Sequence, residues 1–282
     1  MLGLTLEGGA SRSVYSCGVM DVLLEEDIMA DVIVGVSAGA AFSLSYAARQ
    51  HGRNREVALK YMPDKRYMGF KHLLNPKNRS IYNLDFVFYE LPEKLLPFDY
   101  EAFEAYHGKI FGVLTDIETG EAVYRELPRD DHKCMYLRAS CALPLLFPIF
   151  ELDGRKYMDG GIVDSIPYKK AMEEGCDKNI VVLTREVGYK KTTDRSTAFA
   201  ARRFRHYEEF SDKLLKRADM YNTKIAELEQ LEKEGKVFIF RPDDTTGIAR
   251  TESDPKVLEM LYNKGADDAR RRMAELKEYL SK

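Results

Sequence analysis

The first fifty residues alternate short apolar runs with segments of helical periodicity. Residues 2–6 and 31–36 are apolar runs typical of buried strands, and each run ends at a glycine turn. Apolar side chains recur at helical spacing over residues 13–26, and an alanine-rich segment compatible with a helix covers residues 38–50. This order of strand, helix, strand and helix predicts a βαβ unit and a parallel sheet.

The middle of the chain continues this pattern. It predicts a helix over residues 134–142 and strands over residues 109–115, 122–126, 155–158 and 179–184, the first two joined by a hairpin turn. The segment 51–108 is rich in proline and aromatic residues, and we expect short helices and loops there on one side of the sheet. This segment forms either a lid over a site or a plain cover for the sheet, and the sequence leaves both interpretations open.

The last third of the chain is strongly charged. Over residues 196–235 the apolar positions fall three, four or seven apart, which predicts one long amphipathic helix or two in series. Residues 254–281 form one or two more helices. We therefore predict one domain, divided into a core over residues 1–188 and a helical C-terminal extension packed on it, over residues 189–282, with one strand at 237–241.

The charge balance and the cysteine content argue against some classes of function. The 43 basic and 46 acidic side chains give a formal net charge of −3, which argues against nucleic-acid binding. None of the four cysteines forms a Cys-x-x-Cys pair, so neither a zinc site nor a redox-active pair is indicated, and we expect reduced thiols. We also expect no cofactor. The first residues lack the features of a signal peptide, and the most apolar stretch, 32–42, is about half of a membrane span. We expect a soluble, cytoplasmic protein, for which transient contact with a membrane surface stays open.

One pentapeptide carries candidate chemistry. Gly35-Val36-Ser37-Ala38-Gly39 has the Gly-x-Ser-x-Gly spacing of a nucleophile elbow, between a predicted strand and a predicted helix. Gly35 and Gly39 omit side chains where the turn brings strand and helix together, and the helix N-terminus favours an oxyanion beside Ser37. Ser37 is therefore the candidate nucleophile.

A general base for Ser37 is harder to find among the histidines. The order Ser…acid…His of an α/β-hydrolase permits a triad with Asp159 and His206, but His206 lies in a polar helical stretch and Ser37 follows only the second strand. The other four histidines precede Asp159 in charged, loop-like contexts. Asp159-Gly160-Gly161 follows a predicted strand, so a glycine turn places Asp159 at the carboxyl edge of the sheet. A partly desolvated carboxylate there can act as the base.

The loop Glu7-Gly8-Gly9-Ala10-Ser11-Arg12 lies between the first strand and the first helix. Its backbone N–H groups suit an anion, either a phosphate or the oxyanion of a reaction intermediate. The loop matches neither Gly-x-Gly-x-x-Gly nor the Gly-Lys-Ser/Thr ending of a phosphate loop, which weakens the nucleotide interpretation.

These three motifs in this order resemble the patatin-like phospholipase family. Residues 139–148, Ala-Ser-Cys-Ala-Leu-Pro-Leu-Leu-Phe-Pro, also resemble the family's segment before the aspartate, and the charged extension is similar to that of a bacterial subgroup. The resemblance implies a three-layer α/β/α fold with a mainly parallel central sheet and a helical C-terminal extension. It also implies a serine acyl hydrolase that cleaves phospholipid, lysophospholipid or neutral-lipid esters without a metal.

The resemblance assigns roles to single residues. It implies a Ser–Asp dyad of Ser37 and Asp159 without histidine, and an oxyanion hole formed by the amides of Gly8, Gly9 and Ala10, with Arg12 nearby. The family loop usually reads Gly-Gly-Gly-x-Arg-Gly, whereas Ala10 and Ser13 stand here at the third and sixth positions. A positive φ at either position strains a residue that carries a side chain.

Two alternatives to this hydrolase remain open. One is an α/β-hydrolase-type esterase with a Ser–Asp–His triad, and the other is a catalytically weak lipid-binding or regulatory protein of the same fold. Residues 143–150 form either an acyl pocket or plain core, and the basic clusters 202–205 and 270–272 either meet anionic lipid or form a solvated helix face.

Overall fold

A single eight-stranded sheet organises the molecule. The computed structural model describes all 282 residues, and the strands run in the spatial order β5-β6-β3-β2-β1-β7-β8, with β4 also paired to β3. The strands are β1 (Leu2–Leu6), β2 (Val32–Gly35), β3 (Lys109–Asp116), β4 (Ala122–Glu126), β5 (Phe150–Leu152), β6 (Arg155–Asp159), β7 (Lys178–Val182) and β8 (Phe238–Phe240). The pairings among β3, β2, β1, β7 and β8 are parallel, whereas β4, β5 and β6 join as antiparallel hairpins. The prediction of a mainly parallel sheet is confirmed.

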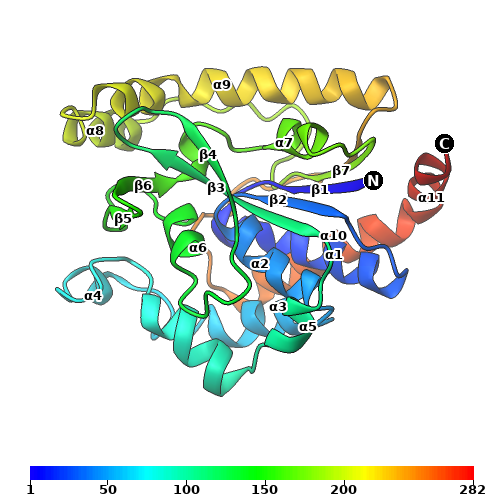
Figure 1. Cartoon of the computed structure of the whole chain (residues 1–282), viewed down its shortest axis with the longest axis horizontal. Helices are drawn as coiled ribbons and strands as arrows, with labels where there is room; N and C mark the ends of the chain where they lie inside the picture. Colours follow the sequence, from blue (N-terminus) through cyan, green and yellow to red (C-terminus); the bar gives the residue numbers. More distant parts are fainter.

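Helices cover both faces of the sheet, which gives the predicted three layers (Figure 1). One face carries α7 (Tyr168–Glu173), α8 (Arg195–Arg203) and α9 (Glu208–Lys233). The other carries α1 (Val14–Glu25), α2 (Ala38–Ala47), α3 (Arg53–Glu56), α5 (Tyr100–Glu104), α6 (Met135–Ser140) and α10 (Pro255–Arg271). The remaining helices and helical turns are η1 (Ala10–Ser13), η2 (Val57–Tyr61), α4 (Phe70–Leu73), η3 (Phe86–Leu95), η4 (Gly160–Ile162) and α11 (Met273–Ser281).

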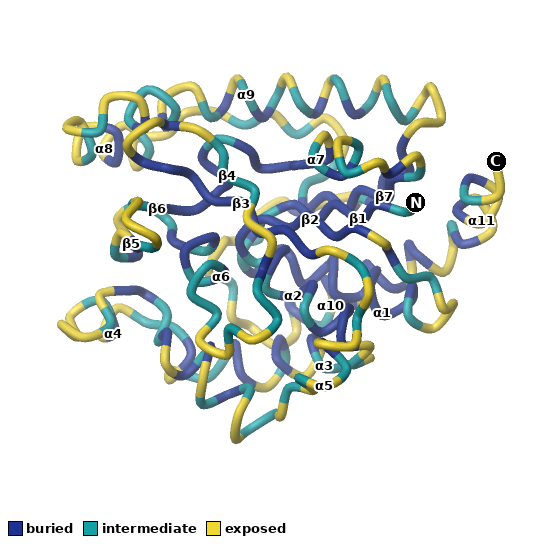
Figure 2. The backbone as a smooth tube through the Cα atoms, in the orientation of Figure 1, coloured by how far each residue is buried: buried dark blue, intermediate teal, exposed yellow.

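The alternation of side chains along the strands divides the core between these layers. In β7, Ile180 and Val182 belong to the large cluster on the α1 side, whereas Val181 packs with Leu228 of α9. The strands are buried along most of their length, while α9 is exposed along its outer edge (Figure 2). Burial on both faces explains why the strands read as continuous apolar runs.

The structure decides several details that the pattern left open. The charged segment forms two helices in series, α8 and α9, and the last segment forms α10 and α11. The strand predicted at 237–241 covers residues 238–240, and β5 was not predicted because its three residues are too short for a period-2 signal. None of the helices has both the length and the apolar character needed to cross a bilayer.

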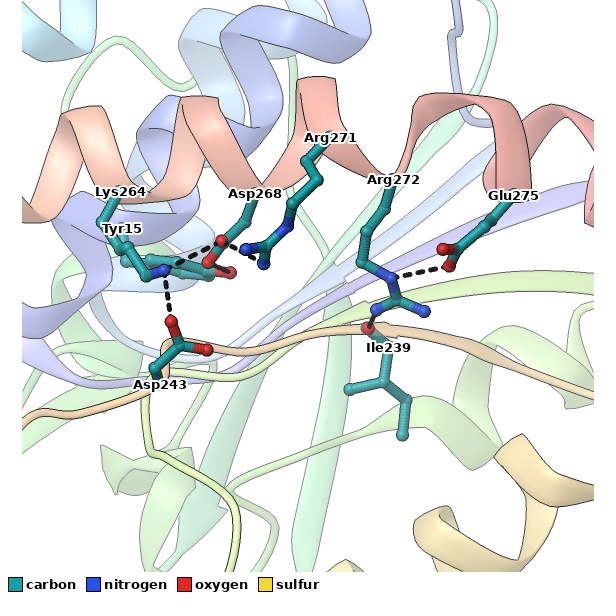
Figure 3. Close-up of polar contacts among 8 residues, drawn as sticks. All are labelled: Tyr15, Ile239, Asp243, Lys264, Asp268, Arg271, Arg272 and Glu275. Atoms are coloured by element: carbon teal, nitrogen blue, oxygen red, sulfur yellow. Dashed lines mark hydrogen bonds and ion pairs between the residues drawn. The ribbon is translucent and has the colours of Figure 1, made fainter.

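The C-terminal part of the chain packs against the sheet and the first helix. Strand β8 pairs in parallel with β7, and α10 packs along α1. Figure 3 shows the polar contacts of α10: the Tyr15 hydroxyl donates to Asp268 at 3.0 Å, and the guanidinium of Arg272 donates to the backbone oxygen of Ile239 at 2.5 Å. The division at residues 188 and 189 stays a prediction, but the C-terminal segment contributes both a strand and a core helix.

The basic cluster 270–272 is engaged within the chain. Arg270 pairs with Glu25 of α1 at 2.8 Å, Arg271 with Asp268 at 2.7 Å, and Arg272 with Glu275 at 2.9 Å. Arg270 and Arg272 therefore connect α10 and its C-terminal end to α1 and α11, whereas the pair of Arg271 lies within α10.

Candidate active site

Ser37 occupies a strained turn between β2 and α2. Its backbone has φ 55° and ψ −125°, a region that costs a residue with a side chain about 1–3 kcal/mol. A Cβ at Gly35 would lie 2.5 Å from the Cα of Ala40, and a Cβ at Gly39 would lie 2.6 Å from the backbone oxygen of Leu6. Both positions therefore require glycine for this strand, turn and helix to pack so closely.

Ser140 holds the turn from the side. The amide of Ser37 donates to the Ser140 hydroxyl at 3.1 Å, and that hydroxyl donates to the backbone oxygen of Val113 in β3 at 2.7 Å. Ser140 is fully buried at the end of α6. The strained backbone of Ser37 is thus fixed by a hydrogen bond from a distant part of the chain.

Asp159 reaches the same edge of the sheet from the opposite direction. Gly35 pairs with Gly112 of β3, and Asp159 pairs with Leu114, so Ser37, two residues beyond Gly35, and Asp159 lie at one level. The sequence predicted that a glycine turn after a strand would present Asp159 at this edge. The structure adds that the strand, β6, is antiparallel to β3.

The carboxylate of Asp159 is buried, and only one of its two oxygens has a hydrogen-bond partner. Its Oδ1 accepts the amide of Gly161 at 2.7 Å, while its Oδ2 has no hydrogen-bond partner. Burial raises the pKa of Asp159, and the nearby Arg217, the Ser37 hydroxyl and the Gly161 amide oppose that rise. The unpartnered Oδ2 leaves an acceptor free in the pocket that Ser37 also lines.

The glycine loop packs against the serine turn. A Cβ at Gly8 would lie 3.2 Å from the Cβ of Ser37, and the amides of Gly8 and Gly9 donate no hydrogen bond within the protein. Ala10 begins η1, so its amide has no partner inside that turn. The backbone at Ala10 has φ 49°, which strains an alanine by about 1–2 kcal/mol, whereas Ser13 is helical with φ −67°.

Ser37 stands at the junction of two pockets. The polar pocket, of about 490 Å³, is lined by Gly8, Gly9, Ala10 and Asp159, together with five cationic side chains. The apolar pocket, of about 590 Å³, is lined by Phe42, Met62, Tyr67, Tyr82, Phe88 and Phe147. Five of its residues also line a deeper cavity of about 920 Å³ below the 51–108 segment.

No histidine lines either pocket. His206 is exposed in the turn between α8 and α9, and His72 contacts the backbone oxygen of Lys65 at 3.1 Å. No group of three His, Cys, Asp or Glu side chains is placed to hold a metal ion. The carboxylates that line the pockets of Ser37 are therefore Asp159 and Glu7.

Comparison with known proteins places this geometry in a family. The family model described as patatin-like phospholipase matches residues 4–172, which contain the glycine loop, Ser37 and Asp159. The chain belongs to the patatin-like phospholipase family. A second model, a domain of unknown function (DUF6363), matches residues 207–281 of this patatin-like chain.

Curated relatives share the family domain at low identity. The chain is 28% identical to the uncharacterized protein YjjU of Escherichia coli over 186 residues, 65% of this chain and 52% of YjjU. It is 25% identical to the lysophospholipase NTE1 of Saccharomyces cerevisiae over 189 residues, 62% of this chain and 10% of NTE1. The chain thus spans about half of the first relative and a tenth of the second. Among solved structures, VipD from Legionella pneumophila aligns with a TM-score of 0.45 and 13% identity, over 97% of this chain and 66% of VipD.

Sequence reasoning missed several residues that this patatin-like site contains. Ser140 was seen only as part of a segment, and four cations of the polar pocket were not singled out: Arg185, Lys191, Arg217 and Arg250. No local signal distinguishes these cations, because charged residues are frequent throughout the C-terminal part of the chain.

Proposed function

We propose that this protein is a serine hydrolase that cleaves carboxylic esters of phospholipids or lysophospholipids through Ser37 and Asp159. The observation that carries the proposal is the pairing of these two side chains in one pocket. Ser37 is held in a strained turn, and the Oδ2 of the buried Asp159 is free to accept its proton. The family, whose relatives include proteins named lysophospholipase, supports lipid esters as the substrate class.

The reaction proceeds in two halves. The Oγ of Ser37 attacks the ester carbonyl carbon as its proton passes to Asp159, and the tetrahedral intermediate then collapses with that proton leaving on the alcohol. Water next attacks the acyl-serine, gives its proton to Asp159, and releases the carboxylic acid as Ser37 regains a proton. Asp159 is the base in each attack and the acid in each collapse.

The glycine loop supplies the oxyanion hole. The amides of Gly8, Gly9 and Ala10 have no competing acceptor, and Gly8 packs directly against Ser37. Donors fixed in this way stabilise the negative charge that develops on the carbonyl oxygen in the transition state. The strain stored at Ala10 is consistent with a loop that is held for this purpose.

The apolar pocket accommodates the acyl chain. Ser37 forms part of its wall, and Leu143 lies between it and the polar pocket. In this proposal the segment 51–108 contributes aromatic residues to an acyl site, and residues 143 and 147 line the same site rather than plain core.

Labelling with a fluorophosphonate probe tests the nucleophile. The wild-type protein is expected to gain one phosphonyl adduct on the peptide that contains Ser37, measured by intact mass and peptide mapping. The Ser37→Ala variant should remain unlabelled, while His206→Ala should label like the wild type because His206 is exposed and remote. Loss of labelling in His206→Ala would favour a triad, and an unreactive wild-type Ser37 would favour a lipid-binding protein.

The pH dependence of ester hydrolysis reports the base. Burial raises the pKa of Asp159 above its ordinary value of about 3.9, and only the carboxylate accepts a proton. Activity is therefore expected to fall as the pH drops through this raised pKa. Because Arg217 lowers the pKa of Asp159, Arg217→Gln is expected to move the acidic limb of the kcat/KM profile to higher pH. An acidic limb at the same pH in this variant would contradict the assignment.

A further inference from the structure

Four cations from distant parts of the chain meet beside Ser37. Arg185 and Lys191 follow β7, Arg217 projects from α9, and Arg250 lies in the loop before α10. All four line both the polar pocket and an outer pocket of about 850 Å³, which is lined in addition by residues 192–194. All four lie beyond the matched patatin domain, and Arg217 and Arg250 lie within the second matched segment, residues 207–281.

None of these four side chains is paired with a carboxylate. Neighbouring cations of the C-terminal segment are paired: Lys216 with Asp212 at 2.9 Å, Lys224 with Asp164, and Arg241 with Glu229 at 3.2 Å. Arg202, Arg203 and Arg205 are also without an ion pair, but they are exposed, whereas the four cations line a pocket.

Each acid in the same pockets accepts a backbone amide, although the Oδ2 of Asp159 stays without a partner. Glu7 accepts the amide of Thr184 at 2.6 Å, and Asp159 accepts the amide of Gly161. Asp194 caps α8 through the amide of Thr197 at 2.7 Å. Five cationic side chains, with Arg12 included, thus line the two pockets against three acids.

Three of the four cations are anchored by neutral groups. Arg217 donates from Nε to the backbone oxygen of Gly161 at 2.6 Å, and Arg185 donates to the Thr245 hydroxyl at 2.8 Å. The backbone of Lys191 exchanges two hydrogen bonds with the Asn222 side chain on α9, at 2.9 and 3.0 Å. The Nζ of Lys191 lies 3.9 Å from the centroid of the Tyr221 ring. Such anchoring reduces the ordering needed when a ligand binds.

The clustered charges repel one another. Burial and the nearby Arg217 lower the pKa of Lys191 well below its ordinary value, and Arg250 adds to this effect. Burial, together with Arg185 and Arg250, also lowers the pKa of Arg12, at the inner end of the pocket, to about 10. Glu7 and Asp159 offset part of this repulsion, and a bound anion would relieve more of it.

We propose that Arg185, Lys191, Arg217 and Arg250 form a subsite for the phosphate of the substrate's head group. The inference rests on the proposed function, because it places the ester carbonyl at Ser37. With the acyl chain in the apolar pocket, the alcohol side of the ester points into the polar pocket, where the cations lie. The C-terminal segment thereby contributes directly to substrate choice.

Two substrates with the same acyl chain test the subsite. One is a 1-acylglycerol 3-phosphate and the other the corresponding 1-acylglycerol, which lacks the phosphate. We expect the wild type to prefer the phosphate-bearing ester, and the ratio of the two kcat/KM values to fall about tenfold in Lys191→Gln and in Arg250→Gln. The matched control is Lys216→Gln, an exposed and paired cation one residue before Arg217 on α9, whose ratio should equal that of the wild type. Equal ratios in all four proteins would overturn the subsite.

Binding measurements separate this inference from the hydrolase proposal. Calorimetric titration of the full-length Ser37→Ala variant with glycerol 3-phosphate should show binding that weakens when Lys191→Gln and Arg250→Gln are added. Lack of any hydrolysis by the wild type, with binding retained, would refute the proposed function and keep the anion subsite. Absence of binding would refute the subsite. If inorganic phosphate binds as tightly as glycerol 3-phosphate, the site is one for a free anion and the head-group assignment is refuted.

Discussion

Replacement of Asp159 by Asn is expected to lower kcat/KM for a carboxylic ester by about 10²- to 10⁴-fold, the usual contribution of a general base. Asparagine keeps the oxygen that accepts the Gly161 amide but lacks a basic Oδ2. The Ser37→Ala variant should lose the acyl-enzyme route altogether. Steady-state hydrolysis of a soluble ester measures both effects.

The stability of Asp159→Asn separates a catalytic role from a structural one. Because burial raises the pKa of Asp159 in the folded protein, the folded state binds this proton more tightly than the unfolded state does. The ionised carboxylate therefore opposes folding at pH values above that raised pKa. We expect the melting temperature of Asp159→Asn at pH 7 to equal or exceed that of the wild type.

The double variant provides the control for Asp159→Asn. If the two side chains act as one unit, Ser37→Ala combined with Asp159→Asn should be no slower than Ser37→Ala alone. Multiplied effects in the double variant would show that Asp159 acts independently of Ser37. A low melting temperature of Asp159→Asn would instead indicate a structural carboxylate.

Substitution of Gly18 or Gly265 by alanine is expected to produce the largest loss of stability. The helices α1 and α10 cross at these two glycines, where a Cβ at Gly18 would lie 2.0 Å from the backbone oxygen of Tyr262. A Cβ at Gly265 would lie 2.0 Å from the backbone oxygen of Tyr15. Backbone atoms yield only if the helices separate, so each change is expected to lower the free energy of unfolding by about 1–3 kcal/mol or more.

Chemical denaturation of matched variants tests this packing. Gly69→Ala is the control, because a Cβ there meets no atom within 4 Å and the backbone at φ 161° is extended. Gly69→Ala should unfold at the wild-type denaturant concentration, and the other two variants at clearly lower ones. Wild-type midpoints for Gly18→Ala and Gly265→Ala would show that α10 is not held closely against α1.

The local pattern of the sequence determined much of the fold and the centre of the site. Seven of the eight strands were predicted from the sequence, and the turns that end β1, β2 and β6 carry the glycines beside Glu7, Ser37 and Asp159. Such signals are local: a strand's apolar run and the glycine after it lie within about ten residues. The parallel order of β1 and β2 brings the glycine loop and Ser37 together, whereas Asp159 arrives on the antiparallel strand β6.

The sequence also identified a feature of the loop whose outcome required coordinates. Ala10 and Ser13 both replace glycine in the usual family pattern, but only Ala10 adopts a positive φ. Both residues disfavour positive φ for the same steric reason. The backbone path between β1 and α1 decides which of them is strained.

Only the tertiary structure decided which of the many charged residues belong to the site. Arg217 lies on α9 among other cations of the same type, and no periodicity separates it from Lys216, which faces solvent. Its position beside Asp159 depends on how α9 docks across the sheet, as that of Arg250 depends on the loop between β8 and α10. The sequence determined most of the strands, the turns and the two candidate catalytic side chains, because those signals arise between near neighbours. The cations came together only through contacts between segments far apart in the chain, which local patterns do not encode.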